Sequence, residues 1–183
     1  PVLAKFTNAM YRGFDLNYPD VERTKAFLTE LAEYEKTGTM PRLIVMRLGN
    51  DHTFGSAAGK TAPLSSAADN DYAVGMLVEG VSKSRFWGST AIMILEYDAQ
   101  NGPDHVDSHR SPGFVISSWT KRHAVDSTMY NTTSMLRTIE FLLGLRPMTH
   151  FDAAARPMAT VFQSQPNTAP YTAEKPRISL DEK

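Results

Sequence analysis

Two continuous apolar runs place the strongest limit on how this chain can fold. Residues 43–46 read Leu-Ile-Val-Met, and residues 90–96 read Thr-Ala-Ile-Met-Ile-Leu-Glu. Because neither run alternates apolar with polar side chains, each predicts a short strand that is buried on both faces. Strands of this kind occur in sheets that helices cover on both sides, so the runs favour an α/β fold.

Helical patterns lie between and around these runs. Apolar residues recur at helical spacing in three segments, residues 21–36, 69–84 and 128–143. Asp20 and Asp69 stand where the first two helices begin, and their carboxylates can cap those helices. A third strand is predicted over residues 113–117. This order of elements predicts an α/β sandwich around a mainly parallel sheet.

The bulk composition narrows the class of partner. The chain has 183 residues, 42% of them hydrophobic, which is enough for one domain with a core. Its 19 basic and 20 acidic residues leave a charge of -1, so nothing favours a nucleic acid or an anionic membrane as partner. Since the chain has no cysteine, any metal must be held by imidazole, carboxylate, amide or hydroxyl groups. A small substrate fits this composition better than a charged polymer.

Polar side chains follow each of the first two predicted strands. Asp51 and His52 come after the first, and Asp98 comes after the second. In parallel sheets, ligands bind beyond the carboxyl ends of the strands, so we expect these clusters to share one edge. A third cluster, residues 104–110, follows at once, and its histidines and acids alternate. In an extended segment they would project to one side, which is the arrangement of a metal clamp.

The residue types in these clusters suit divalent cations. Zinc, manganese and iron accept mixed shells of imidazole and carboxylate. Two such ions close together stabilise the attacking and leaving oxygens in phosphate ester hydrolysis. Arg110 could contact a phosphate group through a bidentate, charge-assisted pair of hydrogen bonds.

Each cluster also has an ordinary explanation that stays open. Asp51 and His52 can form a turn with a surface histidine, and Asp98 can cap the turn that follows it. The carboxylates of the third cluster can be solvated loop residues. The metal hypothesis is favoured because three of the five histidines lie in clusters that also contain aspartate. The other two, His123 and His150, lack such neighbours and are expected to be surface or structural residues.

Three longer motifs show a resemblance to a known family. They are Asn-Asp-His-Thr at 50–53, Tyr-Asp-Ala-Gln-Asn-Gly-Pro-Asp-His-Val-Asp-Ser-His-Arg at 97–110 and Tyr-Asn-Thr-Thr-Ser-Met-Leu-Arg-Thr-Ile-Glu at 130–140. Together they resemble bacterial phosphoesterases of the alkaline-phosphatase-like superfamily. The nearest resemblance is to the phosphoesterase module often fused behind a β-propeller of YVTN repeats, which is related to acid phosphatases and phospholipases C. The similarity covers residues 41–158. It implies a partial phosphoesterase domain over residues 1–158, followed by an extended, proline-rich tail over residues 159–183.

This resemblance implies a three-layer α/β/α sandwich and one or two divalent metal ions, zinc or manganese. It also implies hydrolysis of phosphate mono- or diesters in a small substrate, through a covalent intermediate on Ser or Thr. The residues that match metal ligands of the family are Asp51, His52, Asp98, His105 and His109. Relatives suggest a periplasmic or secreted location, while the sequence itself leaves the compartment open.

The chain departs from the family pattern at its beginning. Members of the superfamily carry a metal-binding Asp and the nucleophile in an N-terminal segment, and nothing before Pro41 matches either. The chain is therefore expected to be a C-terminal portion that lacks the N-terminal part of the domain. A missing segment or another chain would then complete the site. The alternative is a catalytically incomplete fragment that acts as a metal-binding or assembly module.

Overall fold

A computed structural model describes residues 2–96 and 111–183 of the chain. The described residues form two compact units, one of Pro1–Phe86 with Pro170–Lys183 and the other of Trp87–Ala169. The proposed site residues Asp98, His105, His109 and Arg110 lie outside the described residues. Each of the two units has its own internal contacts.

The first unit is built on two helices, α1 (Asp20–Thr37) and α2 (Pro63–Lys83). Both confirm helices predicted from the sequence. Helix α1 ends where Gly38 takes a left-handed conformation with φ of 73°. Helix α2 begins before Asp69, because Pro63 supplies a φ suited to the first helical position and lacks the N–H that would be unpaired there.

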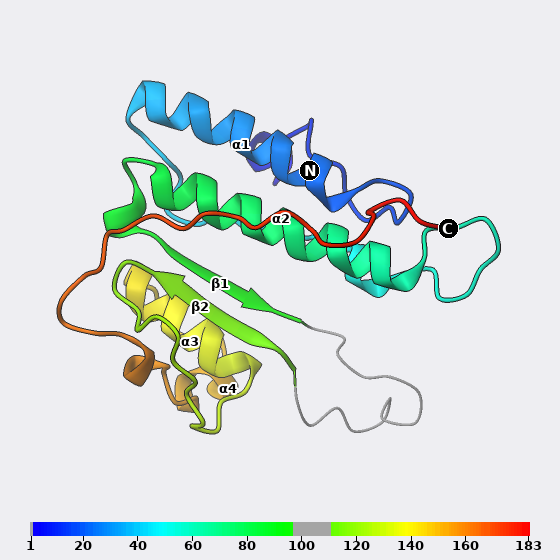
Figure 1. The fold of residues 1–183 in the computed structure, drawn as a ribbon. Helices are drawn as coiled ribbons and strands as arrows, with labels where there is room; N and C mark the ends of the chain where they lie inside the picture. The colour runs from blue at the N-terminus through cyan, green and yellow to red at the C-terminus, as the bar shows by residue number, and fades with distance from the viewer. Residues whose placement is uncertain (1, 97–110) are drawn as a thin grey trace. The chain divides into compact units, whose positions relative to one another are not determined.

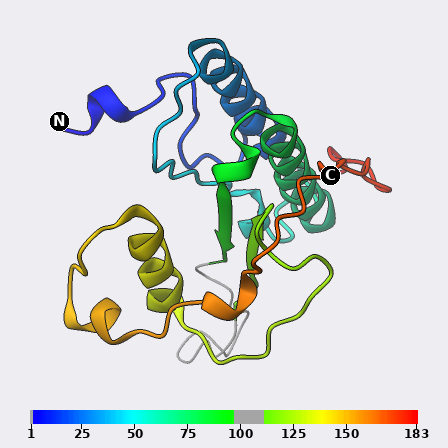
Figure 2. The ribbon, with the colours of Figure 1, turned by 90° about the vertical axis from the view of Figure 1, so that its left-hand side faces the viewer.

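Helices α1 and α2 pack side by side, as both ribbon views show (Figures 1 and 2). The buried apolar side chains of this contact are Phe27, Leu31, Ala73, Leu77 and Val81. They follow the helical spacing that predicted them. The Thr24 hydroxyl donates to the carbonyl oxygen of Ala73 at 3.1 Å, which adds a buried hydrogen bond between the helices.

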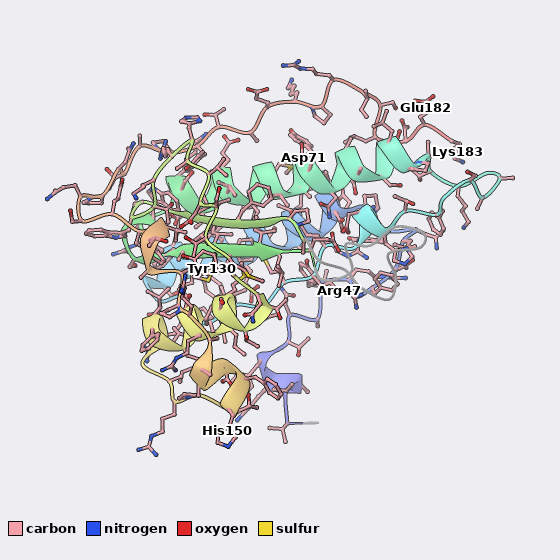
Figure 3. All side chains as sticks on the ribbon, turned by 90° about the horizontal axis from the view of Figure 1, so that it is seen from below. Arg47, Asp71, Tyr130, His150, Glu182 and Lys183 are labelled. Atoms are coloured by element: carbon pink, nitrogen blue, oxygen red, sulfur yellow. The ribbon has the colours of Figure 1, made fainter. Side chains whose placement is uncertain are left out.

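The C-terminal tail runs extended along α2 (Figure 1). The backbone N–H of Tyr171 donates to the Ser82 hydroxyl, and that of Ala173 donates to the Glu79 carboxylate. Near the start of the helix, the Ala62 N–H donates to the carbonyl oxygen of Glu182 at 2.7 Å. Figure 3 labels Glu182 and Lys183 at this end of the tail. Polar backbone contacts therefore hold the tail against the first unit.

The strand predicted over residues 43–46 is wrong. These residues are extended, but they belong to no strand. Leu43 and Val45 are 53% and 86% exposed rather than buried. Among the described residues no backbone hydrogen bond pairs this segment with a neighbouring strand. An apolar run becomes a buried strand only where a neighbour accepts its backbone groups, and local sequence cannot show that neighbour.

The second unit contains the strands β1 (Ala91–Leu95) and β2 (Gly113–Ser117), which confirm two predicted strands. They pair antiparallel, with Ala91 opposite Ser117 and Leu95 opposite Gly113. Parallel neighbours were expected, but parallel pairing needs a crossover, usually a helix, and residues 97–112 carry no helical pattern. Every residue of β1 is half-buried rather than fully buried. The three-layer sandwich remains a prediction.

The second unit also contains α3 (Thr132–Leu143) and the short α4 (His150–Ala154). Helix α3 begins later than predicted because the Asn131 side chain accepts from the backbone N–H of Ser134 and caps it. Met135 is buried as expected, whereas Leu142 is exposed. Short 3-10 helices occupy Ala4–Phe6, Asn50–His52, Trp87–Ser89 and Ala159–Val161. None of the helices in the described part of the chain is both long and apolar enough to cross a bilayer.

The helix pair of the first unit should depend on Leu31. We expect Leu31→Ala to lower the free energy of unfolding by about 2–4 kcal/mol, because it leaves a cavity where the side chain is 4% exposed. Urea unfolding followed by circular dichroism measures this change. Leu64→Ala is the matched control, because Leu64 is 67% exposed and its truncation should have little effect. Equal stability of the two variants would contradict the packing described for α1 and α2.

Candidate functional site

The Asp51–His52 motif lies in a 3-10 turn, Asn50–His52, in the first unit. Asn50 is buried, Asp51 is half-buried and His52 is exposed. The turn follows the extended segment and precedes the loop that leads to α2. Of the metal ligands predicted from the sequence, only Asp51 and His52 lie among the described residues, and the fold places them side by side.

The buried carboxylate of Asp20 fixes the start of this turn. One of its oxygens accepts from the backbone N–H of Gly49 at 3.0 Å, and the other accepts from that of Asn50 at 2.8 Å. The Asn70 side chain on α2 donates to Asp20 at 3.0 Å and to Asp51 Oδ1 at 3.5 Å. Asp20 is thus the first residue of α1 rather than its N-cap, which is Pro19. Its side chain anchors the turn.

A second buried carboxylate, Asp69, joins the turn to both helices. Asp69 lies within α2, so the prediction that it caps this helix is wrong. It instead accepts from the backbone N–H groups of Asp20 and Val21, at 2.6 and 3.4 Å, at the start of α1. It also accepts from Asn50 Nδ2 at 2.8 Å. Burial raises the pKa of the Asp69 carboxyl, and the hydrogen bonds from Asp20, Asn50 and Val21 oppose that rise.

The side chain of Arg23 forms an ion pair with the buried Asp20 carboxylate. Its guanidinium is 1% exposed and donates to Asp20 Oδ1 at 2.9 Å. It also donates to four backbone carbonyl oxygens in residues 12–18, at distances of 2.5 to 3.0 Å. All five N–H groups of the guanidinium are therefore used. The same side chain secures the N-terminal segment and neutralises Asp20.

The ring of His52 has a defined tautomer. Its Nδ1 lies 3.1 Å from the carbonyl oxygen of Thr53. Because a carbonyl can only accept, Nδ1 carries the proton, and in the neutral ring the lone pair is on Nε2. Metal-binding histidines are commonly oriented by this kind of bond. The ring of Phe14 meets the imidazole edge-on, with ring centres 5.9 Å apart, and limits its movement.

Thr53, directly after the turn, has a strained backbone. Its φ of 59° and ψ of 174° fall in a region that is occupied almost only by glycine. A β-branched residue with positive φ is an outlier, and such strain costs about 1–3 kcal/mol. The Thr53 hydroxyl accepts from the backbone N–H of Gly55 at 3.0 Å, which helps to hold this conformation. Strain of this kind is frequent at functional sites and supports a role for the turn.

The described residues do not contain a complete metal cluster. Within residues 2–96 and 111–183, no group of three or more His, Asp or Glu side chains could hold an ion. The predicted ligands Asp98, His105 and His109 lie outside this part of the chain, as does Arg110. His150 is exposed, in agreement with the expectation that it is a surface residue.

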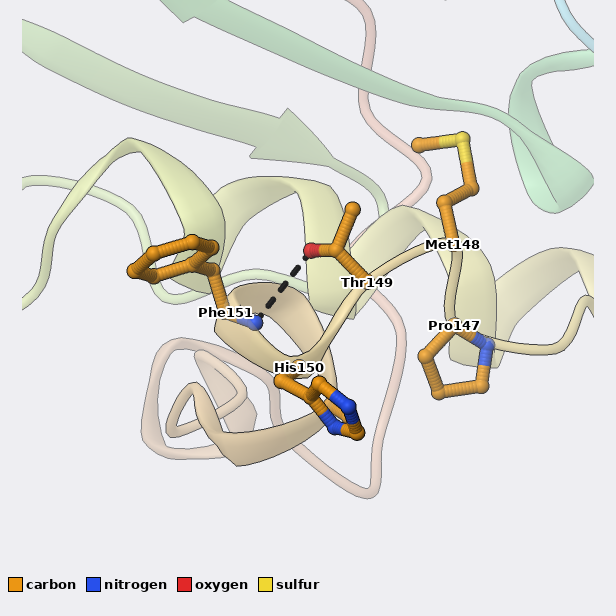
Figure 4. A pocket seen from close by; sticks show the side chains of 6 residues that line it. Pro147, Met148, Thr149, His150 and Phe151 are labelled. Atoms are coloured by element: carbon orange, nitrogen blue, oxygen red, sulfur yellow. Dashed lines mark hydrogen bonds between the residues drawn. The ribbon is translucent and has the colours of Figure 1, made fainter.

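A separate hollow of about 530 Å³ lies around α4 (Figure 4). Its lining residues are Pro147, Met148, Thr149, His150, Phe151 and Ala153. Figure 4 shows the Thr149 hydroxyl accepting from the N–H of Phe151 at 3.2 Å, so this hydroxyl caps α4. The lining carries no carboxylate, lysine or arginine, so it does not resemble a metal or phosphate site.

Sequence reasoning missed the buried residues that support the turn. The sequence pattern predicts Asp20 and Asp69 only as helix caps. It assigns no role to Arg23 or Asn70. Charged residues within amphipathic helices are usually solvated, and the pattern alone gave no sign of burial. One sequence feature does indicate this ion pair: Asp20 and Arg23 are three residues apart, which places them on the same face of a helix.

The hydrogen bonds and the ion pair of Asp20 predict that its substitution destabilises the first unit. Asp20→Asn should lower the free energy of unfolding by about 3 kcal/mol, because it leaves the buried Arg23 without its counter-charge. It should also speed hydrogen exchange at the amides of Gly49 and Asn50, which donate to Asp20. Asp71→Asn is the matched control, since Asp71, labelled in Figure 3, is exposed on α2. If both variants exchange and unfold alike, Asp20 does not anchor the turn.

Comparison with known proteins agrees with the family resemblance of the motifs at residues 50–53 and 97–110. A family model described as the Phosphoesterase family matches residues 15–146. The matched range contains Asp51 and His52 as well as the segment 97–110. No curated protein matches the chain. Because the family model covers most of the sequence, this chain belongs to the Phosphoesterase family.

Proposed function

We propose that this chain is a metal-dependent phosphoesterase that hydrolyses phosphate mono- or diesters. Family membership supports hydrolysis of phosphate esters. The proposed metal dependence rests on the structure of the Asp51–His52 turn. Buried hydrogen bonds hold its backbone, the His52 tautomer leaves Nε2 as a lone-pair donor, and the strained Thr53 follows it.

The residues of the turn fit a divalent cation. A carboxylate beside a neutral imidazole is a donor pair that zinc and manganese accept. We assign Asp51 and His52 to one side of the metal site and Asp98, His105 and His109 to the remainder. A divalent cation bound there would polarise the phosphoryl oxygens and lower the pKa of bound water.

The chain's own groups would bind and orient the substrate. Arg110 would contact two phosphate oxygens through its planar guanidinium. Asn70 orients the Asp51 carboxylate from α2, and Phe14 holds the His52 ring. We assign no nucleophile within this sequence. In our proposal a Ser or Thr on a further segment or on another chain supplies it.

Activity assays test this function. With the segment or chain that carries the nucleophile present, we expect hydrolysis of an aryl phosphate or an aryl phosphodiester to require added zinc or manganese and to stop on chelation. His52→Ala and His109→Ala should each lower kcat/KM by about 10- to 100-fold, because each removes an imidazole ligand. His150→Ala is the control, since His150 lies on exposed α4. Full activity of the His52 and His109 variants would contradict the assignment. Hydrolysis by this chain alone would contradict the assignment of the nucleophile to a further segment or another chain.

A second candidate function is an assembly module that binds metal or a partner without catalysis. The observation that favours it is the segment 43–46, in which residues 43–45 are exposed; its apolar side chains, and a backbone without strand pairing among the described residues, resemble a sheet edge. Such edges pair readily with other chains. Figure 3 labels Arg47, which directly follows this segment.

Light scattering distinguishes this second function. If residues 43–46 mediate assembly, the wild-type chain should associate as its concentration rises, and Val45→Lys should reduce that association, because a charge on a strand edge opposes pairing. Val125→Lys is the control, since Val125 is 92% exposed outside this segment. A wild-type chain that stays monomeric at every concentration would rule out self-association through this segment.

A further inference from the structure

Asn50 contains a buried polar atom that the described fold does not use. The residue is 8% exposed, and its Oδ1 is buried without a hydrogen-bond partner among the described residues. Buried acceptors in folded proteins nearly always have a partner, because leaving one unpaired costs about 1–3 kcal/mol. An acceptor without a partner among the described residues is therefore available to a water, an ion or a ligand group.

The orientation of the Asn50 amide is determined by its neighbour. Its other terminal atom lies 2.8 Å from Asp69 Oδ2. Asp69 already accepts from the backbone N–H groups of Asp20 and Val21, which makes it an acceptor. The atom that faces Asp69 must then be the donor, Nδ2. It follows that the unpaired atom is the oxygen.

This oxygen belongs to the same turn as Asp51 and His52. The Asp20 carboxylate fixes the Asn50 backbone, and Asn70 connects Asp20 to Asp51. One network thus orients the amide oxygen and the neighbouring carboxylate. An amide oxygen is a neutral, hard donor, and manganese accepts carbonyl and carboxylate oxygens as ligands.

We propose that Asn50 Oδ1 is a ligand of a divalent cation at the Asp51–His52 turn and that Asp69 positions it. This inference rests on the metal dependence proposed above. Asp69 is a positioning residue, because it acts through the Asn50 amide and not on the ion. The proposal also explains why the Asn50 amide and the Asp69 carboxylate are buried, although neither takes part in the apolar packing of the two helices.

Two substitutions at Asn50 separate a ligand from a structural residue. Asn50→Leu removes both the oxygen and the Nδ2 donor, whereas Asn50→Asp removes the donor but keeps an oxygen. If the oxygen binds the cation, Asn50→Leu should weaken Mn²⁺ binding by about tenfold or more, and Asn50→Asp should bind within about threefold of wild type. If Asn50 only pairs with Asp69, both variants should lose binding equally.

Mn²⁺ binding is measured on the full chain by the electron paramagnetic resonance signal of free Mn²⁺, with thermal unfolding as a second readout. Mn²⁺ should raise the Tm of Asn50→Asp more than that of wild type, because the cation offsets repulsion between adjacent carboxylates. Asn17→Leu and Asn17→Asp are matched controls on an exposed asparagine, and both should bind as wild type.

The outcomes separate this inference from the proposed function. If Asp51→Asn and His52→Ala lose Mn²⁺ binding while Asn50→Leu keeps it, the turn binds metal but Asn50 is not a ligand. If the wild-type chain binds neither Mn²⁺ nor Zn²⁺, metal dependence and this inference both fail. Should Asn50→Leu not fold, Asn50→Asp still decides, since loss of its Mn²⁺ binding and of its Tm shift would overturn the proposal.

Discussion

The first unit depends on two buried carboxylates, Asp20 and Asp69, and on the guanidinium of Arg23. Each carboxylate accepts backbone N–H groups from a different part of the chain, so helices α1 and α2 and the turn after residue 48 are tied at one point. Buried charges are costly unless they are paired and fully hydrogen-bonded. Arg23 meets that requirement for Asp20, because its five N–H groups all have acceptors.

This arrangement couples stability to the candidate site. The groups that hold the helices together are the groups that orient the Asp51–His52 turn, so a change in either carboxylate affects both. The strain at Thr53 persists because the preceding turn is fixed through Asp20 and the following loop through the Thr53 hydroxyl. A site with rigid support can hold its ligands in one geometry before a cation or substrate arrives.

Exposed apolar surface is the other notable property of the chain. Residues 43–46 are as apolar as a core strand, yet residues 43–45 are exposed. A family member with an incomplete sheet would show such a segment wherever the neighbouring strand is supplied by another part of the protein or by a partner.

The sequence by itself determined the helices α1, α2 and α3, the strands β1 and β2, and the polar turn at residues 50–52, because hydrophobic period and turn chemistry are local properties. Family membership agrees with its motifs. Only the tertiary structure decided that Asp69 accepts the first backbone N–H groups of α1 instead of capping α2. It also decided that residues 43–45 lie exposed and that the Asn50 oxygen is buried without a described partner. The reason is physical: the hydrogen bond from Asp20 to Asp69 joins residues 49 positions apart. No local pattern specifies which distant group a polar atom will meet.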